Sequence, residues 1–223
     1  ANDEYAKANY SDAAEHYEAV IDEYGSSPEI YFNLGNCYYK LNETGKSILN
    51  YERALRLNPR YENAKINLQL ARQRVVDNII QPPPFFLRAW VNSLTAFLNS
   101  NQWLWTSVTL FVLCLAAFLF FIFGYNVALR KTMFYLAIAL FCLSMTGAAF
   151  AAIRKNQTIN HHDAIIMTGT VTVKSSPDKS GTDLFQLHEG TKVKVKSALG
   201  EWNEIVIGNG NVGWLENRAI EVI

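Results

Sequence analysis

Two long uncharged stretches decide the organisation of this chain: Trp103–Phe123, which reads WLWTSVTLFVLCLAAFLFFIF, and Thr132–Ile153, which reads TMFYLAIALFCLSMTGAAFAAI. The first has 21 residues and the second has 22. Because a helix rises about 1.5 Å per residue, each stretch is roughly 30 Å long, the thickness of the hydrocarbon core of a bilayer. We therefore predict two transmembrane helices, at residues 103–124 and 132–153. The alternative is the buried hairpin of a soluble protein, where uncharged runs of this length are rare.

Charge divides the chain into three parts, although the formal net charge of its 223 residues is zero. Residues 1–29 carry eight acidic side chains against one Lys, and residues 156–223 carry eight against six Lys or Arg. Residues 79–155 carry no acid and five cations, which are Arg88, Arg130, Lys131, Arg154 and Lys155. Cations beside apolar runs are typical of helix ends at lipid headgroups. We expect soluble, membrane and soluble parts in that order, with Arg130 and Lys131 in the loop between the spans.

Residues 1–80 carry a helical repeat with a period of 34 residues. With Pro28 at position 1, the residues that match the pattern are Pro28, Tyr31, Leu34, Gly35, Tyr38, Tyr51, Ala54 and Pro59. In spacing and residue type this resembles the tetratricopeptide repeat, apart from Ser47 at a position where Ala is usual. The resemblance covers one full repeat, the second half of an earlier one, and a lone capping helix at residues 62–78. We expect the natural chain to begin before residue 1.

The resemblance to tetratricopeptide repeats implies a groove that binds a peptide or a partner helix. The positions that face this groove in the family are Glu29, Phe32, Asn36, Tyr39, Lys40, Asn63 and Ile66, followed by Leu70, Gln73 and Arg74. The alternative is that Phe32, Tyr39 and Ile66 only pack against neighbouring helices. Some family members clamp a terminal carboxylate with cations, but Asn63 and Asn67 occupy those positions here, so we do not expect clamping.

Residues 81–102 are predicted to be a linker that lies at the membrane surface. Pro82–Pro84 ends the preceding helix and begins a stiff, extended segment. The following apolar residues recur at helical spacing, at Trp90, Leu94, Phe97 and Leu98. An amphipathic helix that is rich in aromatic residues is suited to the headgroup region of a bilayer.

Residues 165–223, after a linker at 154–164, change to the period-two pattern of β-strands. Residues 170–174 and 191–196 alternate, and Gly, Asn, Pro and Asp mark the turns. About five short strands in this length suggest a small barrel. The order of residues, above all the pair Gly213-Trp214, resembles the bacterial SH3 type 3 family. That resemblance implies an aromatic surface for cell-wall peptides or protein segments, with Trp202 and Trp214 as candidates. The alternative is that both Trp side chains fill the barrel core, since a domain this small needs large residues there.

The sequence offers little that suggests catalysis, and we predict no enzyme, no cofactor and no metal site. His161-His162-Asp163 lacks the spacing that closes a coordination shell. No phosphate-binding loop, nucleophile elbow or Cys–His pair is present, and no basic stretch interleaved with aromatic residues suggests nucleic acid. Cys37, Cys114 and Cys142 form no disulfide framework.

The predicted fold is therefore a multidomain α, membrane and β architecture: tetratricopeptide hairpins, a two-helix transmembrane hairpin and a small SH3-like barrel. This module order resembles the BatE-like family encoded in the aerotolerance operon of Bacteroidetes. The resemblance implies a non-enzymatic scaffold in the bacterial inner membrane, with envelope proteins and the lipid bilayer as partners. The alternative is an anchor that binds peptidoglycan through the barrel. We expect both soluble modules on the periplasmic side, by analogy with the C-terminal family and not from charge.

Overall fold

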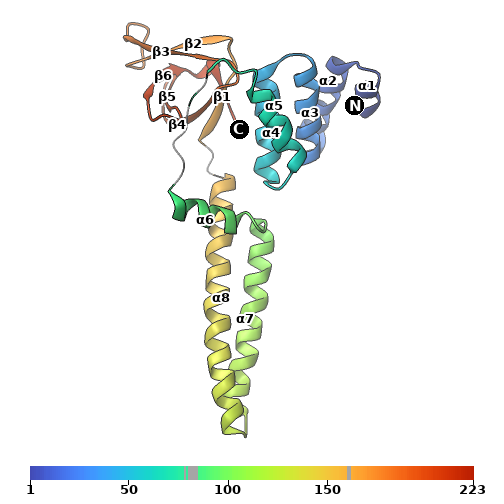
Figure 1. The fold of residues 1–223 in the computed structure, drawn as a ribbon, viewed down its shortest axis with the longest axis vertical. Helices are drawn as coiled ribbons and strands as arrows, with labels where there is room; N and C mark the ends of the chain where they lie inside the picture. Colours follow the sequence, from blue (N-terminus) through green and yellow to red (C-terminus); the bar gives the residue numbers. More distant parts are fainter. Residues whose placement is uncertain (78, 80–84, 160–161) are drawn as a thin grey trace. The chain divides into compact units, whose positions relative to one another are not determined.

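The computed structural model of the chain describes residues 1–77, 79, 85–159 and 162–223 (Figure 1). It contains two compact units. Ala1–Pro83 and His161–Ile223 together form the first unit, and Pro84–Asn160 form the second. The N-terminal helices and the C-terminal sheet thus belong to one unit, and the second unit is inserted between them in the sequence.

The described N-terminal residues form five helices, which are α1 (Asn2–Ala6), α2 (Tyr10–Tyr24), α3 (Pro28–Lys40), α4 (Thr44–Leu57) and α5 (Glu62–Arg72). Local signals place their ends. Gly25 ends α2 with a φ of +86°, a conformation that glycine adopts without strain. Ser27 Oγ accepts a hydrogen bond from the Ile30 backbone N–H at 3.2 Å, and Pro28 is the first residue of α3. Helix α4 ends just before Asn58 and Pro59.

Helices α3 and α4 approach each other closely because Gly35 has no side chain. A Cβ at Gly35 would lie 2.7 Å from the ring of Tyr51, which is itself fully buried. Ala54, one turn after Tyr51, is also fully buried. The pattern of small and aromatic residues that suggested the repeat is therefore a packing pattern here, because the ring of Tyr51 fills the space beside Gly35.

The capping helix is shorter than the sequence pattern predicted. We expected residues 62–78, but α5 ends at Arg72. The chain then leaves the helical direction because Asp77 binds the sheet: its carboxylate accepts hydrogen bonds from the His188 backbone N–H and from Thr191 Oγ1, each at 2.7 Å. These tertiary contacts replace another helical turn. Asn78 lies outside the described residues.

The C-terminal residues form an antiparallel sheet with the order β3-β2-β6-β5-β4-β1-β7. Its strands are β1 (Asp163–Ile166), β2 (Thr170–Lys174), β3 (Asp183–His188), β4 (Lys192–Leu199), β5 (Trp202–Val206), β6 (Val212–Glu216) and β7 (Ile220–Val222). Gly190 and Gly210 turn the chain with φ values of +85° and +92°. An antiparallel sheet in this region agrees with the sequence prediction, while its assignment to an SH3-like barrel stays a prediction.

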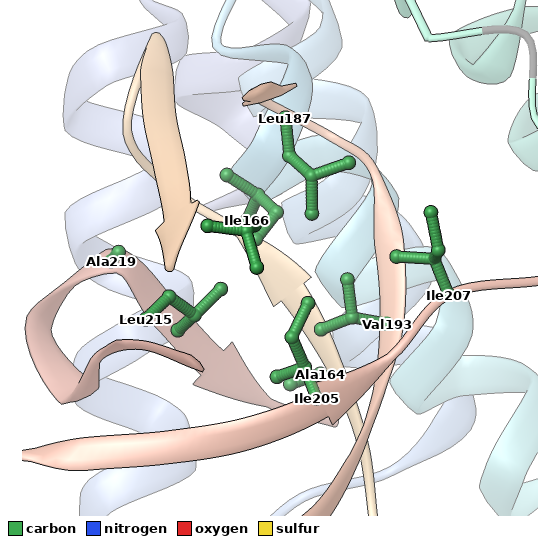
Figure 2. Close-up of a cluster of buried hydrophobic side chains, with 9 residues drawn as sticks. Ala164, Ile166, Leu187, Val193, Ile205, Ile207, Leu215 and Ala219 are labelled. Carbon is green, nitrogen blue, oxygen red and sulfur yellow. The ribbon is translucent and has the colours of Figure 1, made fainter. Parts of the chain in front are cut away.

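The sheet has its own apolar core, most of which Figure 2 shows. Its buried members are Ala164, Ile166, Val173, Leu187, Val193, Ile205, Ile207, Leu215 and Ala219. They come from six of the strands and from the connections after β5 and β6. Strands that are far apart in the sequence therefore pack their side chains into the same core. Ile79, from the chain that follows α5, also packs against this core.

Strand β1 joins the sheet to the helices because it is buried on both of its faces. Ala164 and Ile166 belong to the core of the sheet, whereas Ile165 points the other way and is fully buried against the helices. The second cluster consists of Ile48, Leu49, Tyr51, Leu68, Ala71, Ile165 and Ile223. The helices and the sheet therefore share a hydrophobic core.

Polar contacts seal the edge of this shared core. Glu52 accepts from Arg72 at 2.5 Å and from Lys192 at 3.0 Å, and Lys192 also lies 3.1 Å from Asp163. Burial lowers the pKa of Lys192, but the charges of Glu52 and Asp163 outweigh it and raise that pKa overall. Lys192 is thus a charged link between helix α4 and strands β1 and β4.

The described residues of the second unit form α6 (Phe86–Thr95), α7 (Ser100–Phe123) and α8 (Val127–Ile159). Helices α7 and α8 make a hairpin (Figure 1), and the segments Ser100–Phe123 and Val127–Asn156 are long and apolar enough to cross a membrane. Both helices begin before the expected limits of 103 and 132. At the start of α7, the Asn99 backbone N–H donates to Gln102 Oε1 at 3.0 Å.

Arg130 and Lys131 were expected in the loop, and that expectation is wrong. They lie in the first turns of α8, and only residues 124–126 separate the two helices. Asn126 Oδ1 accepts from the Ala128 backbone N–H at 2.9 Å, which starts the helix earlier than the apolar pattern does. Arg130 Nε donates to the Phe121 carbonyl at 3.0 Å, so its side chain reaches back to the end of α7.

Small residues line the contact between α7 and α8. Ser107 Oγ donates to the Ser144 carbonyl at 2.8 Å, and Ser144 Oγ donates to the Ser107 carbonyl at 3.0 Å. A Cβ at Gly147 would lie 3.3 Å from the Cβ of Ser107. Small residues with reciprocal hydrogen bonds let two apolar helices associate closely in lipid. The small-residue stretch of α8 is therefore used inside the hairpin.

Candidate functional site: the groove of the helical repeat

A cavity of about 230 Å³ lies among the first helices of the repeats. We call it the groove cavity, and its lining residues are Tyr5, Asn36, Tyr39, Lys40, Tyr51, Asn67 and Leu70. They come from α1, α3, α4 and α5, which the repeat stacks side by side. Three aromatic rings, two amides, one amine and one leucine give this cavity apolar walls with a few polar groups. Such a lining, mostly apolar with a few polar groups, is typical of ligand-binding pockets.

Asn36 is the polar centre of the groove cavity. Its Oδ1 accepts hydrogen bonds from the Tyr51 hydroxyl and from Asn67 Nδ2, both at 2.8 Å. Burial raises the pKa of Tyr51, so its hydroxyl stays protonated and remains a donor. These two bonds orient the Asn36 amide and leave its Nδ2 donor without a protein partner in the described part of the chain. The free donor could bind a peptide carbonyl.

Tyr39 is held by its neighbour Arg74. The guanidinium of Arg74 lies 3.6 Å from the centre of the Tyr39 ring, and Arg74 donates to the Tyr39 carbonyl at 3.0 Å and to Asn42 Oδ1 at 3.2 Å. A guanidinium over a ring is attractive and restricts the ring. The Tyr39 side chain is thus fixed as one wall of the groove cavity before any ligand arrives.

The structure brings together four of the ten predicted groove residues, which are Asn36, Tyr39, Lys40 and Leu70. Phe32 instead packs between aromatic rings, 6.0 Å from Tyr51 and 5.0 Å from Tyr61 between centroids, as the packing alternative proposed. Tyr39 combines both roles, since it also packs against the core shared with the sheet. The other five predicted residues are exposed outside the cavity lining: Glu29 on α3, Asn63 and Ile66 on α5, and Gln73 and Arg74 directly after α5.

Two lining residues were missed by the sequence analysis, and one of them had a clear signal. Tyr5 stands 34 residues before Tyr39, so it occupies the same position of the preceding repeat. Tyr51 belongs to a second helix, where family positions give no reason to expect groove contact. It reaches the cavity only because Gly35 lets α4 approach α3.

A second candidate surface lies on the sheet, where Trp202 and Trp214 are half-buried. In β5 and β6, Ile205 and Leu215 are fully buried in the sheet core. Trp202 and Trp214 fall on the opposite faces of these strands, because successive side chains alternate. Trp202 pairs with Glu216 and Trp214 pairs with Glu204, which makes the two rings diagonal neighbours. The alternative that both rings fill the core does not agree with this register.

The structure describes only part of the one segment that was considered as a metal site. His161 lies outside the described residues, so the segment His161-His162-Asp163 is described only in part. Among residues 1–77, 79, 85–159 and 162–223, no group of three or more His, Cys, Asp or Glu side chains could hold a metal ion.

The helices, their spacing and the groove cavity define a class of module, and the comparison with protein families agrees. Residues 28–61 match the tetratricopeptide repeat, which begins at the same Pro28 that the period of 34 placed first. Repeats of this class are typically non-catalytic and bind peptide segments of partner proteins. The comparison with curated proteins and that with solved structures found no match for this chain.

Proposed function

We propose that this chain is a membrane-anchored, non-enzymatic interaction protein whose groove cavity holds an extended segment of a partner protein. The observation that carries the proposal is the Asn36 amide, which is oriented by Tyr51 and Asn67 and has a donor left over. A peptide backbone carbonyl is the acceptor that such a donor suits. The rings of Tyr5 and Tyr39 then contact an apolar side chain of the segment.

The charge of the cavity lining narrows the range of partner segments further. Lys40 is the one cation among the lining residues, it is exposed, and its ammonium can meet a carboxylate. The groove therefore suits a segment in which an apolar residue lies near an Asp or Glu. Such contacts at an exposed rim act mainly on specificity and on the rate of association.

The groove is tested by photocrosslinking the full chain in native membranes. A photoreactive phenylalanine analogue replaces Leu70, which lines the cavity and is 44% exposed. We expect a discrete adduct at this position, which Lys40→Glu abolishes because the acidic segment is then repelled. Lys65→Glu is the matched control, since Lys65 is exposed on the same helix outside the cavity lining and should leave the adduct intact. An adduct that survives Lys40→Glu, or none at position 70, contradicts the proposed groove.

For the membrane part, we propose that α7 and α8 span the inner membrane of a bacterium and that the first unit lies in the periplasm. The length and apolar character of both helices support the spans, and the predicted order of the modules resembles that of BatE-like aerotolerance proteins. Ser180 is exposed in the turn between β2 and β3. Ser180→Cys should therefore react with an impermeant thiol reagent in spheroplasts. Reaction only after lysis would place the unit in the cytoplasm.

A second function, binding of peptidoglycan, is favoured by the position of Trp202 and Trp214. Two neighbouring half-buried rings on an outer sheet face resemble a sugar- or peptide-binding surface, and the bacterial SH3 type 3 resemblance points the same way. We test it by co-sedimentation of the full chain in detergent with purified sacculi. Trp202→Ala should remove the chain from the pellet while Tyr24→Ala, at the end of α2 and 76% exposed, should not. Equal sedimentation of both variants excludes this surface.

A further inference from the structure

Helix α6 is fastened to one end of the α7–α8 hairpin. Trp103 Nε1 donates to the Thr95 carbonyl at 3.1 Å, and the Thr95 side chain is fully buried. The Trp103 ring stands edge-on to Phe150, with centroids 5.1 Å apart. Ser100 Oγ donates to the Ala151 carbonyl at 3.1 Å. The end of α6 is therefore held at the start of α7 and the late part of α8, and in Figure 1 α6 crosses this end of the hairpin.

The fastened helix leaves a row of large apolar side chains uncovered. Phe86, Trp90 and Leu94 follow one another at four-residue intervals, and Phe97 continues the row. Their exposed fractions are 73%, 61%, 37% and 62%. Apolar side chains are unfavourable in water, so a continuous exposed row of this kind indicates a contact with something apolar.

Two features indicate that lipid is what covers this row. The exposed apolar surface continues into the first turns of α7, where Leu104 and Trp105 are more than half exposed. The charged side chains of the second unit are also all cationic, because residues 85–159 contain no acid. In the sequence Arg88 stands between Phe86 and Trp90, and Arg154 and Lys155 follow Ala151 at the end of the hairpin that holds α6. Cations beside an apolar row attract the phosphates of anionic lipids.

A second copy of this chain fits less well. Helix α6 has ten residues and is about 15 Å long. A stable protein interface buries about 800 Å² on each partner, more than one short helix face supplies. A bilayer can cover the row on α6 together with the adjoining apolar surface of the hairpin, so the small area of α6 does not limit this contact.

We propose that α6 is an in-plane helix that binds the headgroup region of a leaflet rich in anionic lipid, and that its attachment at Thr95 and Trp103 sets the depth of the hairpin. This inference rests on the proposed insertion of α7 and α8. It adds a second, lipid-selective contact to the anchor. Because α6 is fixed to the hairpin, the depth of Trp90 and the depth of the spans are coupled.

The test uses the full chain in lipid nanodiscs with 5-fluorotryptophan at all five Trp positions. Single Trp→Phe variants assign the fluorine signals, and a paramagnetic label on the lipid headgroup broadens those nearby. We expect loss of the Trp90 signal, and a stronger loss when phosphatidylglycerol is mixed into phosphatidylcholine. The paired change Arg88→Gln with Lys155→Gln should remove this lipid dependence, whereas Lys131→Gln, in the first turns of α8 at the far end of the hairpin, should keep it.

The same nanodiscs separate this proposal from the insertion on which it rests. Cys142 is exposed on α8 and should be shielded from a water-soluble maleimide when the hairpin is inserted. If Cys142 is shielded but the Trp90 signal is unaffected, the hairpin is inserted and only the proposed lipid contact of α6 is overturned. If the chain forms a dimer that Trp90→Ser dissociates, the partner of α6 is a second copy of the chain and not lipid. A reactive Cys142 overturns both. Equal Trp90 loss in both lipid mixtures overturns the anionic preference.

Discussion

At the scale of single residues, the packing of the repeat depends on the close approach of Gly35 to the ring of Tyr51. Gly35 faces the ring of Tyr51 at a distance that no Cβ could occupy, and the Ser47 carbonyl lies 3.3 Å from the same position. Tyr51 cannot move aside, because it is fully buried and its hydroxyl is bound to Asn36. The groove cavity and the packing of α3 on α4 thus share the same tyrosine.

Gly35→Ala should therefore destabilise the protein and disturb the groove together. We expect the free energy of unfolding to fall by about 1–3 kcal/mol, the usual effect of overpacking a core. Urea titration of the full chain in detergent, followed by hydrogen exchange of α3 and α4, measures this. Gly169→Ala is the control, since a Cβ there meets nothing within 4 Å. Equal stability of the two variants would show that α4 can move away from α3.

At the scale of elements, the segment after α5 fastens the helices to the sheet through Asp77. Burial raises the pKa of this carboxyl, but hydrogen bonds from Thr191 and His188 outweigh it and hold the pKa below its ordinary value of 3.8. His188 Nδ1 lies 2.7 Å from Asp77 Oδ1 and must carry the proton, since a carboxylate only accepts. Asp77 is thus an ionised acceptor for the turn between β3 and β4.

The stability supplied by Asp77 should depend on pH with a definite sign. Because its folded pKa lies below the unfolded one, its contribution is complete above about pH 4 and is lost as the pH falls through the folded value. Asp77→Asn should cost roughly 1–3 kcal/mol at pH 7, and the difference from the natural chain should shrink below pH 4. Urea titrations from pH 7 to pH 3, read by hydrogen exchange at residues 183–199, test this. A difference that stays constant with pH contradicts it.

At the scale of the whole molecule, residues far apart in sequence build one core. Ile165 from the sheet lies with Ile48, Leu68 and Ala71 from the helices, although the inserted second unit separates them in sequence. Both ends of that second unit therefore return to the same compact unit. This arrangement agrees with an even number of proposed spans. The residues that line the groove cavity include none from the sheet.

Ile165→Ala should consequently weaken the helices and the sheet at once. We expect a loss of about 2–5 kcal/mol from the cavity that it opens. Amide exchange should rise in α4, α5 and in strands β1 and β4 alike. Val222→Ala, at a half-exposed position of the neighbouring strand β7, is the control and should change little. Faster exchange confined to the sheet would show that the two parts unfold independently.

Much of the architecture was accessible from the sequence because it depends on local patterns. The period of 34 placed the repeat at Pro28, and the family comparison confirms residues 28–61. Strand β2 has the bounds 170–174 that alternation predicted. The groove lining was predicted in part: Asn36, Tyr39, Lys40 and Leu70 line the cavity, whereas Phe32 packs against Tyr51 and Tyr61. Family positions cannot tell which aromatic ring a neighbouring ring will cover.

By itself, the sequence determined the elements and their classes: helices from small and aromatic residues at repeat spacing, two apolar helices from uncharged runs, and strands from alternation. These follow from side-chain size, charge and backbone preference within a few residues. Only the tertiary structure decided that Asp77 and Ile165 join helices and sheet into one unit, that Tyr51 orients Asn36 in the groove cavity, and that Trp103 holds α6 at the hairpin. Such contacts depend on which surfaces meet when distant segments pack, and no local pattern encodes them.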